Sequence, residues 1–200
     1  RLLAGRTRQP SALVIDSQSA KTTESGGPRG FDSAKHVKGR KRHMLTDTDG
    51  RLVALHVTPA NVQDVHAAAP LIKSIAASLP GARHVFADRV YRGPALMSAI
   101  NDANEGKPFE IEIITRTQTE GTFKAEPKRW VIERTFAWFG RNRRLSKDCE
   151  RKAETETAYF HLASIWLLLC QIARKLGQKC IMGQTLRRPP LGPSRRTHAA

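Results

Sequence analysis

The feature that most constrains the fold is a β-hairpin signal near residue 50. The dipeptide Asp49-Gly50 separates two strand-like runs, HMLTDT and RLVALHV. Asp-Gly readily adopts the tight turn that joins antiparallel strands, and it is the strongest short cue for a hairpin. The sequence therefore predicts two antiparallel strands here, with Asp47 and Asp49 as hairpin residues and Pro59 closing the unit.

Further strands and helices are predicted on both sides of the hairpin. Three short apolar or alternating runs predict strands: Ser11–Asp16, His84–Ala87 and Glu110–Thr115. Helical spacing or helix-boundary residues predict four helices: Asp64–Ala77, Pro94–Ala103, Pro127–Leu145 and Glu154–Leu176. Residues 17–32, rich in Ser, Thr and Gly, predict a loop. This order predicts an α/β fold, with a mixed five-stranded sheet flanked by helices.

The two ends of the chain are expected to lie outside this domain. Residues 1–10 predict a flexible basic lead-in, and residues 11–176 suit a single domain. Residues 177–200 contain RRPPLGPSRR and predict a basic, disordered tail.

The charge balance indicates a polyanionic partner. The chain has 34 Lys and Arg against 18 Asp and Glu, a net charge of +16 and a pI near 10.6. Nucleic acid is the commonest partner of such a chain, and an anionic membrane surface is the alternative. The longest apolar run, Ala163–Cys170, is far shorter than the roughly 20 residues that span a bilayer. We therefore expect no membrane partner and a location in the cytoplasm.

Two basic segments predict where the polyanion binds. Residues 35–43 carry five Lys or Arg and no acid, and they are interpreted as a loop. Residues 141–151 carry another five. Either segment alone is typical of a solvated surface, but two of them beside acidic residues would form a groove for a phosphate backbone. The predicted DNA contacts are Lys35, Lys38, Arg40, Lys41, Arg42, Arg129, Arg134, Arg141, Arg143 and Arg144.

Three acids follow or accompany the predicted strands. Asp16 ends the first strand, Asp88 follows the fourth, and Glu133 lies on the helix after the fifth. Sites in open sheets gather at strand ends, and two neighbouring carboxylates need a cation or a proton between them. Carboxylates select hard cations such as Mg²⁺ or Mn²⁺, and a two-metal site suits in-line displacement at phosphorus. Alternatively, Asp16 and Asp88 begin turns.

The predicted helix Pro127–Leu145 holds one carboxylate among six basic side chains. Its apolar stripe is expected to be core: Ile132, Phe136 and Phe139. Its other face is expected to place three arginines beside Glu133: Arg129, Arg141 and Arg144. The alternative is a surface helix with an ion pair between Arg129 and Glu133.

Four blocks occur in the order of a known family. They are VIDSQS, GPRGFDSAKHVKGRKRHMLTDTDGRLVALHVTPANVQD, VFADRVYRGPAL and WVIERTFAWFGRNRRLSKDCE. Over residues 12–174 the chain resembles the catalytic domain of DDE transposases of bacterial insertion sequences, in the transposase four/five superfamily.

The resemblance implies a ribonuclease H-like fold and an acidic triad of Asp16, Asp88 and Glu133. It implies two Mg²⁺ or Mn²⁺ ions, and DNA cleavage followed by strand transfer at the ends of the element. The implied partner is double-stranded DNA, bound by a homodimer at the bacterial nucleoid. Arg129 matches the arginine of the related Tyr-Arg-Glu-Lys signature, whose Tyr and Lys positions hold Glu126 and Gly140 here.

Two departures from the family pattern keep other functions open. Val90 replaces a frequent glycine, and it would be strained if that backbone needed a positive φ. The family's N-terminal helical region has no counterpart in the sequence. An inactive, truncated transposase that binds DNA or inhibits the full-length protein is therefore the alternative function, and a host nuclease of the same fold is a third.

Overall fold

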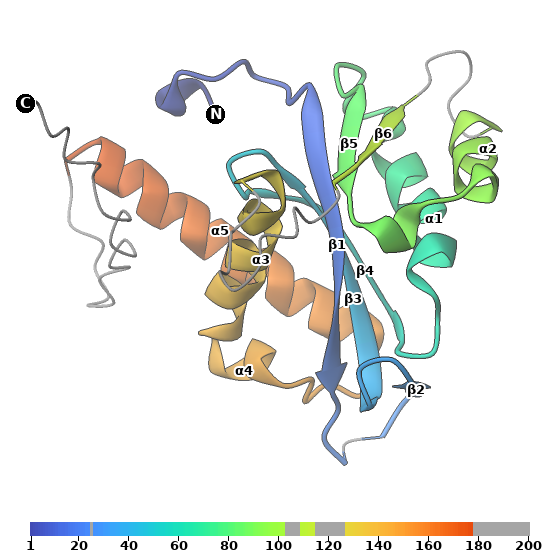
Figure 1. The fold of residues 1–200 in the computed structure, drawn as a ribbon. Coiled ribbons are helices and arrows are strands. Elements are labelled where there is room, and N and C mark those ends of the chain that lie inside the picture. The colour runs from blue at the N-terminus through green and yellow to red at the C-terminus, as the bar shows by residue number, and fades with distance from the viewer. Residues whose placement is uncertain (25, 103–108, 115–126, 178–200) are drawn as a thin grey trace, which may run out of the picture.

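The computed structural model describes residues 1–24, 26–102, 109–114 and 127–177. Its centre is one mixed sheet (Figure 1). The strands of this sheet are β1 (Ala12–Lys21), β2 (Gly30–Asp32), β3 (Val37–Asp47), β4 (Leu52–Pro59), β5 (His84–Ala87) and β6 (Glu110–Ile113).

The sheet is built around β1. Strand β3 pairs with it antiparallel and β5 pairs with it parallel, while β6 extends the parallel side. Strand β4 returns antiparallel along β3 through the predicted turn at Asp49-Gly50. All five predicted strands are thus present in a mixed sheet flanked by helices, which confirms the ribonuclease H-like fold class. Strand β2 is an additional short strand that pairs antiparallel with the first residues of β3.

Two strands are longer than predicted. Strand β1 continues past Asp16 to Lys21, and β3 begins at Val37, so the two pair from Leu13 opposite Asp47 to Lys21 opposite Gly39. The prediction that residues 35–43 form an exposed basic loop is therefore wrong. Most of this segment is a central strand, because acids distant in sequence neutralise its charges.

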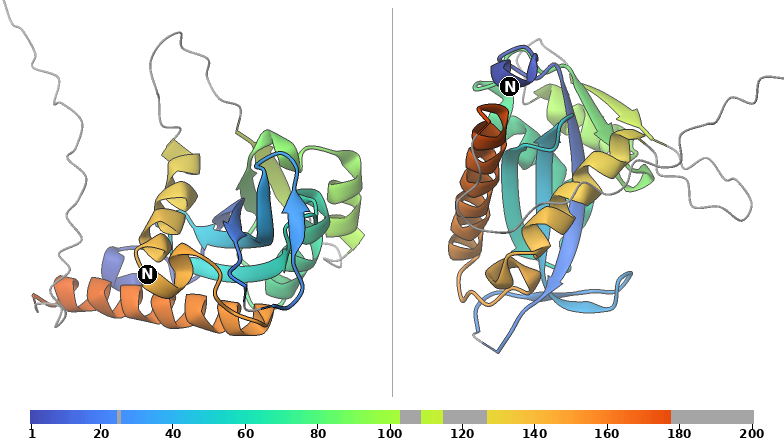
Figure 2. Two further views of the ribbon diagram at one scale, coloured as in Figure 1. Left: turned by 90° about the horizontal axis from the view of Figure 1, so that it is seen from below. Right: turned by 90° about the vertical axis from the view of Figure 1, so that its left-hand side faces the viewer.

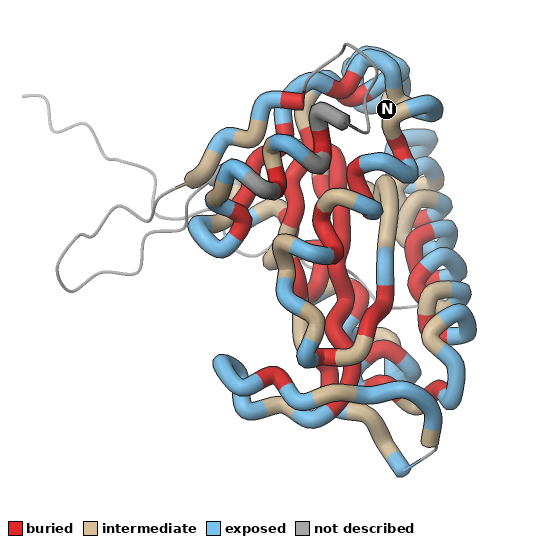
Figure 3. The backbone as a smooth tube through the Cα atoms, turned by 90° about the vertical axis from the view of Figure 1, so that its right-hand side faces the viewer, coloured by how far each residue is buried: buried red, intermediate tan, exposed pale blue. Residues whose placement is uncertain are grey.

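Helices cover both faces of the sheet (Figures 1 and 2). The helices α1 (Asp64–Ala76) and α2 (Pro94–Asp102) pack on the face that carries Leu13 and Ile15. The opposite face carries Val14 and packs against α3 (Pro127–Gly140), α4 (Arg143–Ser146) and α5 (Ala153–Lys175). The strands between them form the buried centre of the molecule (Figure 3).

Helix α3 is shorter than the predicted helix Pro127–Leu145. It ends at Gly140, and Asn142 precedes the separate short helix α4. The predicted core stripe is confirmed, since its three members are buried: Ile132, Phe136 and Phe139. The prediction that Arg141 and Arg144 share a helix face with Glu133 is wrong, because both lie beyond the end of α3.

The N-terminal residues contact the domain. They contain a short 3₁₀ helix, η1 (Leu2–Ala4), and Arg1 forms an ion pair with Asp47 of the hairpin. The predicted C-terminal tail lies outside the described residues from residue 178 onward. Among the helices that the structure describes, none is long and apolar enough to cross a membrane.

Candidate active site

Asp16 lies in the middle of β1 rather than at its end. It stands opposite Met44 of β3, and Met44 belongs to the core beneath α3 and α5. The Asp16 side chain therefore points to the α3 side of the sheet, where it is partly buried. Its Oδ1 accepts the N–H of Ser17 at 2.7 Å.

Asp88 and Asp16 lie on neighbouring parallel strands. Val14 of β1 pairs with Phe86 of β5. Asp16 lies two residues after Val14 within β1, and Asp88 lies two residues after Phe86, just beyond the end of β5. Asp88 caps the short 3₁₀ helix η2 (Arg89–Tyr91), and its Oδ1 accepts the N–H of Arg89 at 2.5 Å. Because the strands run parallel, the two carboxylates occupy the same region of the sheet, as the sequence predicted.

Arg129 joins Asp88 to Glu133. Its Nη1 lies 3.1 Å from Asp88 Oδ2, and its Nη2 lies 3.4 Å from Glu133 Oε1. Arg129 and Glu133 are one turn apart on α3, so the helix brings its acid to the end of β5. The positive charge of Arg129 also acts on Asp16. One guanidinium therefore contacts two of the predicted acids, and its charge acts on the third, although the three come from distant parts of the sequence.

Comparison with known sequences decides what kind of protein carries this arrangement. Residues 7–169 match the family described as the transposase DDE domain. The chain belongs to the DDE transposase family. Its resemblance to this family, inferred above from four sequence blocks, is thereby confirmed, and the family as a whole cleaves DNA and depends on divalent metal ions.

Two relatives come from insertion sequences. The chain is 35% identical over 170 residues to a putative transposase for insertion sequence element IS402 of Burkholderia cepacia, covering 81% of this chain and 74% of that protein. It is 26% identical over 185 residues to a transposase for element IS1106 of Neisseria meningitidis serogroup B, covering 85% of this chain and 62% of that protein.

The carboxylates of this DDE domain have the chemistry that a hard divalent cation requires. Burial raises the pKa of Asp16 to about 6, against the Ser17 N–H and the charges of Arg129 and Lys35, while the charge of Asp88 adds to the rise. In this conformation no three acid, His or Cys side chains among the described residues are close enough to hold a metal ion. The oxygen-only donor set still fits Mg²⁺ or Mn²⁺, because both are hard cations that carboxylate oxygens bind.

The departure at Val90 does not strain the backbone. Val90 lies within η2 with an exposed side chain, and among the described non-glycine residues a positive φ is found at His36, not at Val90. The next residue, Tyr91, is buried in the core on the α1 side of the sheet, and its hydroxyl has no hydrogen-bond partner among the described residues. Valine is therefore accommodated here without the glycine that the family often has.

Two of the predicted DNA contacts are structural arginines. Arg40 is 1% exposed, and its Nη1 lies 2.8 Å from Asp148 Oδ2. Arg42 is 2% exposed, and its Nε and Nη2 each lie 2.6 Å from Glu156 Oε1. Both side chains are enclosed between the sheet and the C-terminal helices, so they cannot reach a DNA phosphate in this structure.

Lys41, on the other side of β3, is also buried. Its Nζ lies 3.6 Å from Asp32 Oδ2 and 3.4 Å from Asp64 Oδ1. Sequence reasoning missed these acidic partners, together with the acids that hold Arg40 and Arg42. The signal was present in residues 148–156, where four acids follow a basic stretch, but the partners of Asp148 and Glu156 on β3 are more than 100 residues away.

The remaining predicted DNA contacts differ in whether their side chains are exposed and whether they pair with other residues. Four are exposed and have no ion pair within the described part of the chain: Lys35, Lys38, Arg141 and Arg143. Arg144 is exposed but pairs with Glu150 at 2.6 Å and covers the ring of Tyr159. Arg134 covers the ring of Trp138 and donates to the carbonyl oxygen of Asp49 at 3.1 Å.

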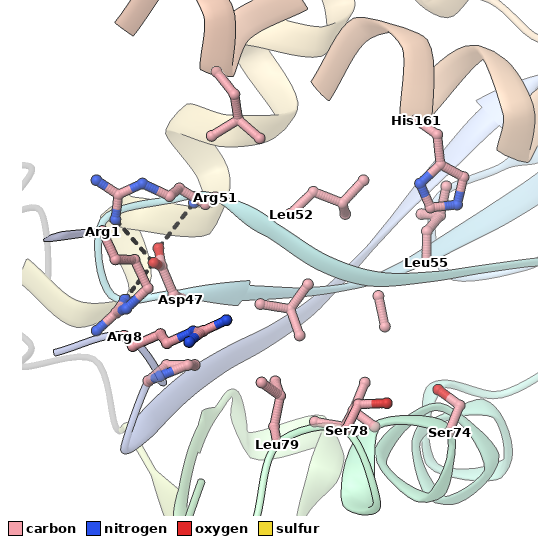
Figure 4. Close-up of a pocket in the computed structure, with 15 residues that line it drawn as sticks. Arg1, Arg8, Asp47, Arg51, Leu52, Leu55, Ser74, Ser78, Leu79 and His161 are labelled. Carbon is pink, nitrogen blue, oxygen red and sulfur yellow. Dashed lines mark hydrogen bonds and ion pairs between the residues drawn. The ribbon is translucent and has the colours of Figure 1, made fainter. Parts of the chain in front are cut away.

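A cavity of about 570 Å³ lies away from the three acids. It is enclosed by the N-terminal residues, β4, α1 and α5 (Figure 4). At one edge of the cavity, Asp47 forms ion pairs with Arg1 and Arg51. His161 of α5 lies at another edge. None of the predicted metal ligands lines this cavity, so we do not assign the catalytic site to it.

Proposed function

We propose that the protein cleaves the ends of an insertion sequence and joins them to target DNA, with Asp16, Asp88 and Glu133 as the ligands of two Mg²⁺ or Mn²⁺ ions. The observation that supports this most directly is the contact of Arg129 with both Asp88 and Glu133. A single cation reaches acids from the end of β5 and from α3, beside the acid of β1. This is the place where a catalytic cation would neutralise the same charges.

The acids and the basic residues would divide the work. Bound ions would lower the pKa of the attacking water or 3′-hydroxyl and stabilise the oxygen that leaves phosphorus. Asp16 and Asp88 would fix the site to the rigid sheet, and Glu133 would bring in α3. The exposed Lys35, Lys38, Arg141 and Arg143 would hold the phosphate backbone beside the acids, with Arg144 after release from Glu150.

Two further expectations remain proposals. The DNA complex would contain two copies of the chain, one for each end of the element. The protein would act at the nucleoid in the bacterial cytoplasm, where its net charge of +16 favours association with DNA. An assay of DNA cleavage distinguishes the inactive alternative from the proposed function, since the alternative predicts DNA binding without cleavage.

Nicking of supercoiled plasmid DNA in the presence of Mn²⁺ tests this function. We expect Asp16→Asn, Asp88→Asn and Glu133→Gln each to reduce nicking roughly a hundredfold or more, since each weakens the binding of the metal ions that stabilise the transition state. Glu154→Gln is the matched control, because Glu154 is an exposed acid on α5. Nicking by Glu133→Gln at the rate of the unmodified protein would contradict the assignment. Absence of nicking by every variant and by the unmodified protein would favour the inactive alternative.

A further inference from the structure

Arg129 is paired differently from the structural arginine Arg40. Arg40 donates from all three of its nitrogens, to Pro28, Asp148, Glu150 and Arg151. Arg129 makes longer contacts of 3.1 Å and 3.4 Å, and both go to carboxylates. Its Nε is buried and has no hydrogen-bond partner among the described residues. The pairing of Arg129 is therefore incomplete, whereas that of Arg40 is saturated.

Incomplete pairing of a nearly buried cation is costly. Arg42 also leaves one buried nitrogen without a hydrogen bond, but its other nitrogens make three hydrogen bonds of 2.6–3.1 Å, to Glu156, Gln18 and Leu145. The Arg129 side chain is only 12% exposed, yet its Nε donates no hydrogen bond to any described residue. Meanwhile it uses oxygens of Asp88 and Glu133 that a metal ion would need. The two carboxylates cannot give the same lone pairs to the guanidinium and to a divalent ion.

We propose that Arg129 is the counter-cation of the metal-free site, and that it must leave Asp88 and Glu133 when a divalent metal ion binds there. The released guanidinium then binds a DNA phosphate, which it can contact through two donors at once. This proposal rests on the assignment of Asp88 and Glu133 as metal ligands. It adds that the protein itself supplies a competitor for the metal, on the same helix as one of the ligands.

Metal binding and DNA binding should consequently reinforce each other. DNA that captures Arg129 removes the competitor for the metal, and a metal that displaces Arg129 frees a group for DNA. Such coupling is reciprocal, because each ligand must change the affinity of the other by the same factor. Lys35 also acts on Asp16, but it is exposed and has no ion pair with Asp88 or Glu133 in the part of the chain that the structure describes.

Titration with Mn²⁺ in the absence of DNA tests the proposal, with free Mn²⁺ measured by electron paramagnetic resonance. We expect Arg129→Gln to bind Mn²⁺ about tenfold more tightly than the unmodified protein. The matched control is Arg143→Gln, which removes the same charge from an exposed position and should change the affinity much less. Equal or weaker Mn²⁺ binding by Arg129→Gln would overturn the proposal. So would an equal increase in both variants, because net charge alone would then explain it.

A third variant separates this inference from the proposed function. Glu133→Gln should weaken Mn²⁺ binding if Glu133 is a ligand, whatever Arg129 does. Unchanged binding in Glu133→Gln would refute the metal site itself, and with it the inference. Weaker binding in Glu133→Gln without tighter binding in Arg129→Gln would refute the role of Arg129 alone. Thermal unfolding of each variant verifies that it is folded before the titration.

Discussion

Residues 35–43 and residues 128–144 are both rich in basic side chains, with five and six Lys or Arg respectively. In the structure, the first runs through the centre of the sheet, and Arg40 and Arg42 are enclosed in the protein. The second carries Arg129 at the acidic site and leaves Arg141 and Arg143 exposed. Similar charge runs can therefore stabilise a fold or bind a ligand, and the position of their acidic partners decides between the two.

The buried arginines also explain how the C-terminal part of the chain is attached. Arg40 binds Asp148 in the segment before α5, and Arg42 binds Glu156 in the first turns of α5. Arg42 also donates to the carbonyl oxygen of Leu145 at 2.8 Å. Strand β3 thus holds both ends of the connection between α4 and α5.

The largest effect that this comparison predicts is on stability. We expect Arg42→Ala to lower the free energy of unfolding by about 3–5 kcal/mol, because it leaves the carboxylate of Glu156 buried without its partner. Arg143→Ala, on the exposed segment, should change it by less than about 0.5 kcal/mol. Urea-induced unfolding followed by circular dichroism measures both.

A double variant sharpens the test of Arg42. Replacing both partners, as Arg42→Met with Glu156→Leu, should recover much of the lost stability, since no unpaired charge remains buried. If Arg42→Ala and Arg143→Ala are equally stable, the distinction between structural and surface arginines fails. If the double variant is no more stable than Arg42→Ala, packing rather than the ion pair is the source of the effect.

His43, the last residue of the first basic segment, predicts a pH dependence. Burial lowers its pKa to about 4, with Lys41 and His56 adding to the fall and Asp64 opposing it. The neutral ring, whose Nε2 lies 3.0 Å from Thr58 Oγ1, is thus favoured in the folded protein. An unfolded histidine binds its proton near pH 6.5, so stability is lost as the pH falls from about 6.5 to about 4.

The expected loss from His43 is about 3 kcal/mol over this interval. Comparing the pH dependence of unfolding in His43→Gln and in the unmodified protein isolates it from the titration of acids such as Asp16. The control is His84→Gln, because His84 is 46% exposed. A His43→Gln variant whose stability falls between pH 6.5 and pH 4 as steeply as that of the unmodified protein would show that His43 does not titrate this way.

Features that depend on residues close together in the sequence were predicted, and features that depend on residues far apart in the sequence were not. The hairpin at Asp49-Gly50 and the position of Asp88 after β5 depend on neighbouring residues, and the sequence predicted both. The extension of β1 to Lys21 depends on its pairing with β3, and the burial of Arg40 and Arg42 depends on acids far along the chain. The sequence predicted neither. Local composition indicates solvation for such residues, because it does not show which charges will be neutralised inside the fold.

The smallest expected effect concerns the exposed part of the second segment. If Arg143 contacts one phosphate, Arg143→Ala should reduce the slope of log affinity for duplex DNA against log salt concentration by about 0.9. The affinity itself should fall only severalfold at moderate salt, since one of several contacts is lost. Fluorescence anisotropy with a labelled duplex at a series of salt concentrations measures both quantities.

Lys73→Ala is the matched control for this measurement. Lys73 is an exposed residue of α1, which covers the opposite face of the sheet from α3 and α4. Its removal lowers the net charge equally but should leave the slope unchanged, because counterion release depends on phosphates that are contacted. If the two variants reduce the slope equally, the affinity for DNA depends on net charge alone. A smaller slope for Arg143→Ala alone would place DNA on the α3 and α4 side, next to Arg129 and the three acids.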